Sequence, residues 1–240
     1  MLRRAVIAKQ TESPAPPQGL LLVDKPAGMT SHDVVQHVRR IYGERSIGHL
    51  GTLDPFATGL LVLLLGRATR LATFIDAEPK VYEATIKFGE ETDTDDATGT
   101  VIRAAPVPRE PDVRSAVKSL TGTISQVPPA YSAKSVDGTR AYDAARRGEP
   151  LDLAAVNVTV HSWELGKLSG DSLSAVITCS SGTYIRALAR DLGRLTSSAA
   201  HLQQLRRTRA GDFDVRQAAT LESLADSPSR VRALRVVPDA

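Results

Sequence analysis

Residues 48–65 read GHLGTLDPFATGLLVLLL. Gly48 and Gly51 can adopt backbone conformations closed to other residues and let another molecule approach the main chain. Pro55 disfavours the helical conformation for Asp54 and holds it extended. The apolar run Leu60 to Leu65 predicts a buried strand. The segment therefore places a single carboxylate on a constrained loop that leads into the core, which suits a reactive group.

Asp54 also has an ordinary structural interpretation. Asp followed by Pro commonly begins a helix, with Asp as the N-cap and Pro at the first helical position. On the Asp-Pro dipeptide alone, the helix cap is the favoured interpretation, and the longer motif is needed to choose between the two.

The composition is that of a globular protein with a mild basic excess. The 240 residues are 42% hydrophobic and 24% charged, with a formal net charge of +3. Arginine forks suit phosphate oxygens, so clustered arginines permit a nucleic-acid partner, although solvated helix faces explain any single cluster equally well. The single cysteine excludes an intrachain disulfide and is expected to be buried in a strand. The arginine clusters are Arg39/Arg40, Arg67/Arg70, Arg146/Arg147 and Arg206/Arg207/Arg209.

No targeting or membrane segment is predicted. The apolar stretch Ala5 to Ala8 is too short for a signal-peptide core. The longest apolar run, Leu60 to Leu65, is far shorter than the roughly 18 residues that a membrane span needs. We therefore expect a cytoplasmic protein.

Hydrophobic periodicity predicts strands interspersed with helices and hairpin-type neighbours. This pattern favours an α+β fold with a mixed, largely antiparallel central sheet flanked by helices and loops. Residues 1–18 are predicted to be a flexible leader, 19–226 a single domain and 227–240 a short tail. Strands are expected at 19–23, 60–65, 81–88, 122–127, 156–165, 173–179 and 202–208, and helices at 34–42, 68–76, 109–120, 138–148 and 183–194, with a short helix near the end. Thr30 and Asp33 have the spacing of a capping box before the first helix, and residues 43–59 are expected to form a loop. The strands at 156–165 and 173–179 are expected to pair around the turn between them.

Two apparent motifs are rejected. Ser31, His32 and Asp33 have the residue types of a hydrolase triad, but helix neighbours one and two residues apart point in different directions. The acidic loop at 91–99 superficially resembles a calcium loop, yet Ala104 stands where the bidentate acid would be. Neither a nucleophile triad nor a metal site is expected.

Several motifs in order along the chain resemble those of the TruB-type tRNA pseudouridine synthases. They extend over residues 19 to 215, so the resemblance is highly specific. The motifs are Gly19-Leu-Leu-Leu-Val-Asp-Lys-Pro-Ala-Gly-Met-Thr-Ser31, the Gly48-His-Leu-Gly-Thr-Leu-Asp-Pro55 segment, Lys80-Val-Tyr82, the loop Thr92-Asp-Thr-Asp-Asp96, Pro128-Pro-Ala-Tyr-Ser-Ala-Lys134, Cys179-Ser-Ser-Gly-Thr-Tyr-Ile-Arg186 and Leu205-Arg-Arg-Thr-Arg-Ala-Gly211.

The resemblance implies isomerisation of uridine to pseudouridine at position 55 in the T-loop of tRNA. It implies that Asp54 is the catalytic aspartate, either as a nucleophile or as the electrostatic partner of a developing sugar cation. It implies that Arg186 pairs with this aspartate and that Tyr82 stacks on the flipped uracil. Without the resemblance, Arg186 would be assigned to a helix surface and Tyr82 to the core.

The resemblance also implies the substrate contacts. Tyr184 is expected to line the same pocket and His49 to contact the T-loop. The target uridine must be extruded from the folded T-arm, at a cost of a few kcal/mol. Apart from the resemblance, basic side chains are candidates for contacts with the RNA backbone, and these are Lys25, Arg39, Arg40, Arg206 and Arg207.

The reaction neither oxidises nor hydrolyses, so neither a cofactor nor a metal ion is expected. The expected partner is tRNA, bound at its T-arm. The protein is expected to be a monomer that needs no protein partner. Bacterial family members often carry a C-terminal RNA-binding PUA domain, and the short segment after Asp214 leads us to expect a single catalytic domain without one.

Three other functions remain as alternatives. An RNA-guided pseudouridine synthase shares the Asp-Pro segment but works in a multiprotein particle. A non-catalytic RNA-binding or RNA-folding protein would be expected to lose the aspartate or its arginine, and both are present. A hydrolase or metal-dependent nuclease lacks support, because neither metal-ligand spacing nor a nucleophile elbow is present.

Overall fold

The computed structural model describes residues 18–75, 77–132, 134–136 and 138–226. Except for Gln18, the predicted leader lies outside the described residues, as does the predicted tail.

A nine-stranded sheet forms the centre of the structure. Seven strands follow the order β1-β3-β12-β4-β11-β10-β7, while β2 pairs with β3 and β13 pairs with β12. All pairs are antiparallel except β12 with β3. The predicted α+β class with a largely antiparallel sheet is therefore confirmed. The strands are β1 (Gly19–Lys25), β2 (Ile47–Leu50), β3 (Thr58–Leu65), β4 (Lys80–Phe88), β7 (Gly122–Gln126), β10 (Val156–Ser169), β11 (Ser172–Cys179), β12 (Ala200–Ala210) and β13 (Phe213–Asp214).

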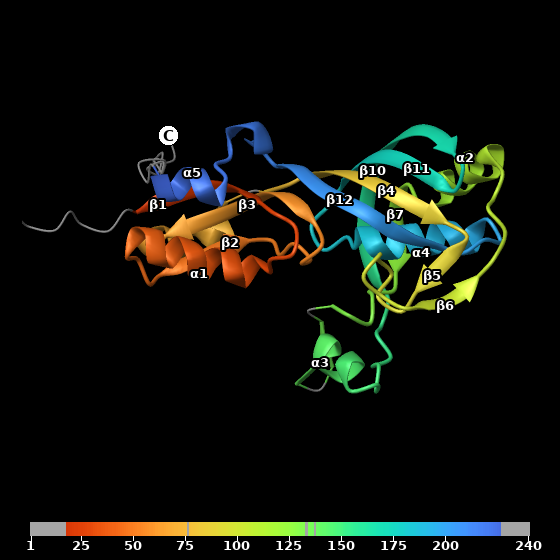
Figure 1. The fold of residues 1–240 in the computed structure, drawn as a ribbon, viewed down its shortest axis with the longest axis horizontal. Coiled ribbons are helices and arrows are strands. Elements are labelled where there is room, and N and C mark those ends of the chain that lie inside the picture. Colours follow the sequence, from red (N-terminus) through yellow and green to blue (C-terminus); the bar gives the residue numbers. More distant parts are fainter. Residues whose placement is uncertain (1–17, 76, 133, 137, 227–240) are drawn as a thin grey trace, which may run out of the picture.

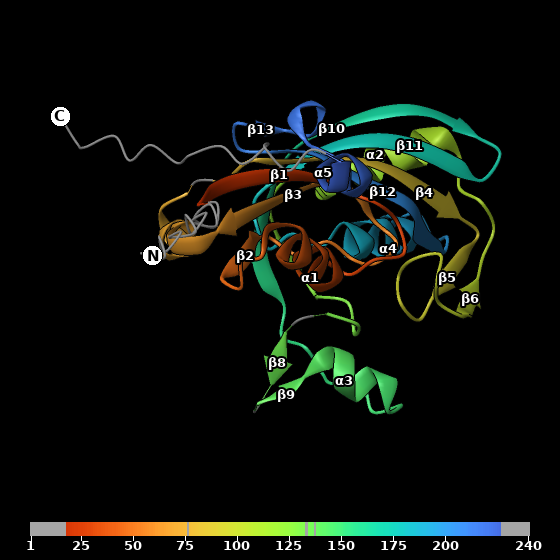
Figure 2. The same ribbon diagram turned by 60° about the vertical axis from the view of Figure 1, so that its left-hand side comes forward.

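Helices and two small hairpins complete the described structure. In Figures 1 and 2, α1 and α4 lie on the same side of the sheet, while α3 with β8 and β9 projects away from it. The helices are α1 (Ser31–Tyr42), α2 (Glu110–Ser119), α3 (Ala141–Arg146), α4 (Ile185–Leu195) and α5 (Leu221–Asp226), with 3-10 helices η1 (Gly66–Phe74) and η2 (Val215–Gln217). The small hairpins pair β5 (Glu90–Thr92) with β6 (Val101–Ala104) and β8 (Ser135–Val136) with β9 (Thr139–Arg140).

The apolar run in β3 is explained by burial on both faces. Leu61, Leu63 and Leu65 join one hydrophobic cluster with α1 and α5, whereas Leu60 and Leu64 join another on the opposite face. A strand covered on both sides carries a continuous hydrophobic run rather than an alternating one. This strand fixes the end of the loop that precedes it.

Helix α1 begins where its sequence predicts. The Thr30 hydroxyl accepts a hydrogen bond from the Asp33 amide, and the Asp33 carboxylate accepts one from the Thr30 amide, completing a capping box. Gly43 ends the helix in the left-handed conformation with φ 64°. The helix start is therefore fixed shortly after β1. This places Ser31 next to Leu53 in the loop at 51–57 that carries Asp54, here called the Asp54 loop.

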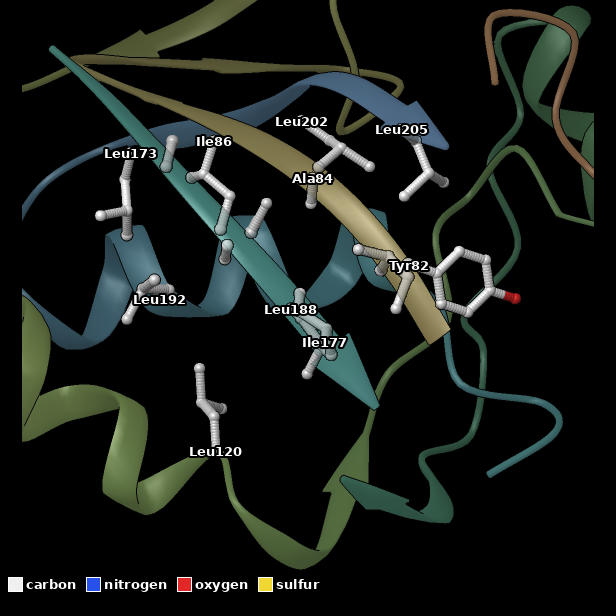
Figure 3. Close-up of a cluster of buried hydrophobic side chains, with 14 of the residues drawn as sticks. Tyr82, Ala84, Ile86, Leu120, Leu173, Ile177, Leu188, Leu192, Leu202 and Leu205 are labelled. Atoms are coloured by element: carbon white, nitrogen blue, oxygen red, sulfur yellow. The ribbon is translucent and has the colours of Figure 1, made fainter. Parts of the chain in front are cut away.

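Helix α4 packs against the other half of the sheet. Its residues Leu188 and Leu192 are fully buried, and they contact a cluster that includes Ile86, Leu173 and Ile177 from the strands. Figure 3 shows this cluster, with Tyr82 at one end and its hydroxyl pointing away from the aliphatic side chains. The start of α4 is thus held rigidly at the edge of the core.

Four sequence expectations differ from the structure. The predicted helix at 138–148 is shorter, because Thr139–Arg140 form strand β9 and α3 covers only Ala141–Arg146. The predicted loop 43–59 contains strand β2, which pairs along β3. The segment predicted as a helix after Leu65 is the 3-10 helix η1. Asp54 begins no helix, since the described residues between it and β3 form only a turn closed by a hydrogen bond from the Ala57 amide to the Asp54 carbonyl. The helix-cap interpretation of Asp54 is therefore wrong.

None of the helices in the described part of the chain has both the length and the apolar character needed to cross a membrane.

We predict that Leu188→Ala lowers the free energy of unfolding by about 3 kcal/mol, because it leaves a cavity between α4 and the sheet. Urea denaturation followed by circular dichroism measures this change. Leu195→Ala on the same helix is the control, since Leu195 is 54% exposed and its loss should cost less than about 0.5 kcal/mol. Equal losses in the two variants would contradict the described packing of α4.

Candidate active site

The loop that carries Asp54 is held on both sides of the carboxylate. The Ser31 hydroxyl accepts a hydrogen bond from the Leu53 amide at 2.9 Å and donates one to the Leu53 carbonyl at 3.2 Å. On the other side, the Pro55 carbonyl accepts a hydrogen bond from the Gly28 amide at 2.8 Å. Because these bonds come from α1 and from the segment before it, Asp54 is fixed relative to β1 and α1.

Lys25 completes this support from the interior. Its side chain is fully buried, and Nζ donates to the carbonyls of Pro26, Met29 and Pro55 at 2.9, 2.6 and 3.2 Å. Burial lowers the pKa of Lys25 to about 8, opposed by the nearby charge of Asp54. The expected contact of Lys25 with the RNA backbone does not fit this position, because a fully buried amine bonded to three carbonyls is not presented to a phosphate. Lys25 instead closes the Asp54 loop.

Asp54 and Arg186 form a bidentate ion pair. Arg186 Nε donates to Asp54 Oδ2 and Arg186 Nη2 to Asp54 Oδ1, both at 2.9 Å. The Arg186 side chain is 4% exposed, whereas that of Asp54 is 33% exposed. The two-point geometry fixes the plane of the carboxylate. The arginine lies behind the carboxylate, which keeps one side open to solvent.

Backbone carbonyls from two other segments fix Arg186 itself. Nη1 donates to the Thr94 carbonyl at 2.8 Å, and Nη2 donates to the Tyr131 carbonyl at 2.9 Å. Asp96 Oδ2 lies 3.8 Å from Nε. A buried charge is tolerated when its polar atoms are bonded, and this guanidinium meets that condition. The orientation of Arg186 is therefore imposed by the protein before any ligand binds.

Tyr82 lies at the edge of the core. It is 7% exposed, and burial raises the pKa of its phenol, opposed by the Arg207 charge and reinforced by the Asp54 charge. The side chain is therefore a neutral phenol at pH 7. Tyr82 belongs to the same hydrophobic cluster as Leu53 and Ala57, the apolar residues on either side of the Asp54-Pro55-Phe56 turn.

Tyr184 immediately precedes α4 and is fixed through its backbone. The Gln126 side chain accepts from the Tyr184 amide at 2.9 Å and donates to the Tyr184 carbonyl at 3.1 Å. Burial raises the pKa of the Tyr184 phenol, and the Asp54 charge adds to this effect. Gln126 is fully buried, so it serves to hold the start of α4, where no side chain caps the helix.

His49 lies on β2, half-buried. Burial lowers the pKa of its imidazole, and the positive charge of Arg207 lowers it further. Among the described residues, its buried Nδ1 has no hydrogen-bond partner. His49 is thus a neutral imidazole at pH 7, which suits contact with a base rather than with a phosphate.

Arg207 is fully buried and supports the Asp54 loop through hydrogen bonds. Nε donates to the Leu60 carbonyl at 2.8 Å and Nη2 to the Gly51 carbonyl at 3.0 Å. Gly51, with φ +78°, allows this approach, because a Cβ atom there would lie 3.3 Å from Arg207 Nη1 and 3.1 Å from Lys80 Nζ. The expected RNA-backbone contact therefore does not fit Arg207 either. Its role in this structure is to hold the loop.

The other expected phosphate contacts lie nearer the surface. Arg40 is exposed and Arg39 half-buried in the last turn of α1. Arg206 is partly exposed and pairs with Asp24 at 2.7 Å. No hydrogen bond or ion pair recorded for the described residues connects these three arginines to Asp54. The structure therefore pairs Asp54 with Arg186 and places Tyr82 in the cluster that holds Leu53 and Ala57 beside them, and leaves these arginines as separate surface groups.

The supporting residues were missed by sequence reasoning. Ser31 and the loop Thr92–Asp96 belong to motifs of the resemblance, but neither is predicted there to support the site. The position of Ser31 one residue after Thr30 at the start of α1 is the only local signal for its contact with Leu53, and Asp95 and Asp96 face the arginines of α4. In the described part of the chain, no three His, Cys, Asp or Glu side chains gather to hold a metal ion.

Comparison with known proteins agrees with the geometry. The sequence matches the TruB family pseudouridylate synthase N-terminal domain over residues 39–185 and the tRNA pseudouridylate synthase B C-terminal domain over residues 186–235. It is 52% identical to tRNA pseudouridine synthase B of Thermobifida fusca, over 86% of this chain and 74% of that protein. It is 49% identical to the protein of the same name from Aromatoleum aromaticum, over 92% of this chain and 72% of that protein.

A solved structure shares the fold. The matching chain in the crystal structure of a Cbf5-Nop10-Gar1 complex superposes with a TM-score of 0.67 at 28% identity, covering 87% of this chain. The present chain spans about half of that longer chain, 54% of its length. The family matches, the close relatives and the Asp54 site together show that the chain belongs to the TruB family of pseudouridylate synthases.

Proposed function

We propose that this chain isomerises the uridine at position 55 in the T-loop of tRNA to pseudouridine. Relatives at about half sequence identity are named tRNA pseudouridine synthase B, and tRNA pseudouridine synthases are isomerases. The observation that carries the proposal is the carboxylate of Asp54, partly exposed and held at both oxygens by the buried Arg186.

The reaction needs no redox step and no external group. The bond between N1 of uracil and C1′ of the ribose breaks, the uracil rotates, and C5 bonds to the same C1′. The proton on C5 leaves and N1 gains a proton, so the product is an isomer of the substrate. The groups required are an anion near C1′ or the base, and surfaces that hold the uracil while it is detached.

Asp54 supplies the anion. It acts as a nucleophile or as the electrostatic partner of positive charge that develops on the sugar, and both roles need an ionised, aimed carboxylate. Arg186 blocks rotation of the carboxylate, because both of its oxygens are bound. With Arg186 buried behind it, the open side of Asp54 is available to the nucleotide.

Aromatic side chains bound the space in front of Asp54. Tyr82 offers its ring to stack on the uracil, and its buried phenol stays neutral at pH 7. Tyr184 lines the same site beside the first turn of α4, and neutral His49 contacts the loop next to the target nucleotide. Stacking on such side chains offsets part of the few kcal/mol needed to flip the base from its stack.

The RNA is held outside the catalytic site by exposed basic groups. Folded RNA loops are recognised by shape, phosphate contacts and splayed bases. Arg39, Arg40 and Arg206 are surface candidates for these contacts. The projecting segment around α3 adds exposed Arg146, whose guanidinium lies 5.1 Å from the centre of the Tyr142 ring. The enzyme is expected to act as a cytoplasmic monomer without a cofactor, guide RNA or obligate protein partner.

We predict that the wild-type chain releases tritium from C5-labelled uridine in a bare T-arm stem-loop, and that Asp54→Asn lowers this rate by more than about 10³-fold because the anion is lost. Asp212→Asn, an exposed site, is the control and should retain full activity. Tritium release by Asp54→Asn at the wild-type rate would exclude Asp54 as the catalytic carboxylate. Wild-type inactivity with tight binding would favour an RNA-folding or partner-dependent protein.

We predict that Ser31→Ala slows the same reaction by about tenfold or more, because the Leu53 amide loses its partner and the Asp54 loop shifts. The unpaired amide should also cost about 1–3 kcal/mol of stability. Thr30→Ala, one residue earlier, removes the helix cap at a cost of about 1 kcal/mol but touches no part of the loop. Comparable activity in the two variants, each at saturating RNA, would show that Ser31 does not position the loop.

A further inference from the structure

Three arginines spaced four residues apart on α4 each meet an acidic side chain. Residues at this spacing lie on one face of a helix. Arg186 pairs with Asp54, Arg190 with Asp95 at 2.9 Å, and Arg194 with Glu91. The first pair belongs to the catalytic site. The second, between Asp95 and Arg190, is 8% and 9% exposed and has no part in the chemistry proposed above.

Asp95 sits at the centre of a tight turn. Its φ of 60° lies in the left-handed region, which residues other than glycine adopt only when surrounding contacts impose it. Its amide donates to the Thr92 carbonyl, its carbonyl accepts from the Leu202 amide at 3.0 Å, and its carboxylate accepts from Arg190. The turn is therefore fixed to β12 through the backbone and to α4 through the ion pair.

Arg190 also holds a second segment. Its Nη2 donates to the Val127 carbonyl at 2.9 Å, while its Nε donates to Asp191 at 2.9 Å. Val127 directly follows β7 and starts the segment that leads to Tyr131. One buried guanidinium thus joins α4 to the turn at Asp95 and to the segment after β7.

These are the two segments that orient Arg186. The Thr94 carbonyl, next to Asp95, accepts from Arg186 Nη1, and the Tyr131 carbonyl accepts from Arg186 Nη2. Displacement of either carbonyl would let the Arg186 guanidinium rotate. Because both oxygens of Asp54 are bound to that guanidinium, the orientation of the carboxylate would change as well.

We propose that Asp95 and Arg190 form a positioning pair for the isomerisation, orienting Arg186 and through it Asp54 without touching the substrate. The inference rests on the proposed function. A buried ion pair is weak evidence for a gain in stability, since apolar replacements are often as stable. Its effect is therefore expected in the turnover number rather than in the affinity for RNA.

The charge state of Asp95 gives the pair a measurable signature. Burial raises the pKa of Asp95 to about 6, opposed by Arg190, Arg186 and Arg194 of α4 and reinforced by Glu91 of β5. As the pH falls through this value, Asp95 gains a proton and the ion pair with Arg190 is lost. The turnover number of the wild type should decline on the acid side near pH 6, and this decline should be absent when residue 95 cannot titrate.

The test compares Asp95→Asn with Glu91→Gln, using T-arm stem-loop RNA. Asp95→Asn is expected to lower kcat by about ten- to a hundredfold at pH 7.5, to leave the Kd for RNA within about twofold, and to abolish the acid-side decline near pH 6. Glu91→Gln breaks another pair on the same helix, in which Glu91 is 2% and Arg194 55% exposed, but leaves the 94–96 turn attached to Arg190. Glu91→Gln is expected to keep the wild-type kcat, even if the midpoint temperature of its thermal unfolding is lower.

A second readout does not depend on turnover. The ¹⁵N signal of Arg186 Nε, assigned by its loss in Arg186→Lys, should shift or broaden in Asp95→Asn and stay unchanged in Glu91→Gln. Arg190→Lys keeps the charge but loses the hydrogen bond to the Val127 carbonyl. It should lower kcat and shift the Arg186 signal as Asp95→Asn does, and it replaces Asp95→Asn in the test if that variant does not fold. Normal kcat and an unchanged Arg186 signal would overturn the positioning role. An inactive wild type with a shifted signal in Asp95→Asn would instead overturn the proposed function alone.

Discussion

The ion pair between Asp54 and Arg186 is the interaction on which the rest of the site depends. A carboxylate that must act as an anion has to be fixed in direction and open on one side, and the pair meets both conditions. The partners are 132 residues apart in the sequence, so they meet only if the sheet is correctly assembled. The cost of burying Arg186 is offset by the Thr94 and Tyr131 carbonyls.

The fold can be understood as the frame for this pair. Helices α1 and α4 lie on the same side of the sheet (Figures 1 and 2), and the Asp54 loop runs between them. Ser31 at the start of α1 holds Leu53, while Arg186 near the start of α4 holds Asp54 itself. Strand β3, buried on both faces, and the buried Arg207 fix the remaining side of the loop. Rigid elements on every side of the loop are what a preorganised carboxylate requires.

The sequence was a good guide to elements with clear periodicity and to motif residues, and a poor guide to contacts between segments. The capping box of α1, the buried strand after Asp54 and the antiparallel pairing of β10 with β11 followed from local patterns. The charge of Lys25 and Arg207 predicts contact with RNA, whereas the alternation of side chains along a strand predicts that both are buried. Each lies two residues after a core residue of its own strand, Val23 or Leu205, and alternation places both side chains inward. The supports at Asp95 and Gln126 could not be foreseen, since they depend on which distant segments the sheet brings to α4.

The most direct test is a crystal structure of this protein with a T-arm stem-loop that carries 5-fluorouridine at the target position. We predict that the target base is flipped out of the RNA and stacked on Tyr82, and that the nucleotide contacts or is bonded to the Asp54 carboxylate. Arg186 should retain both hydrogen bonds to Asp54. A target nucleotide that remains stacked in the loop, or that binds elsewhere and leaves Asp54 without contact, would contradict the central role of this ion pair.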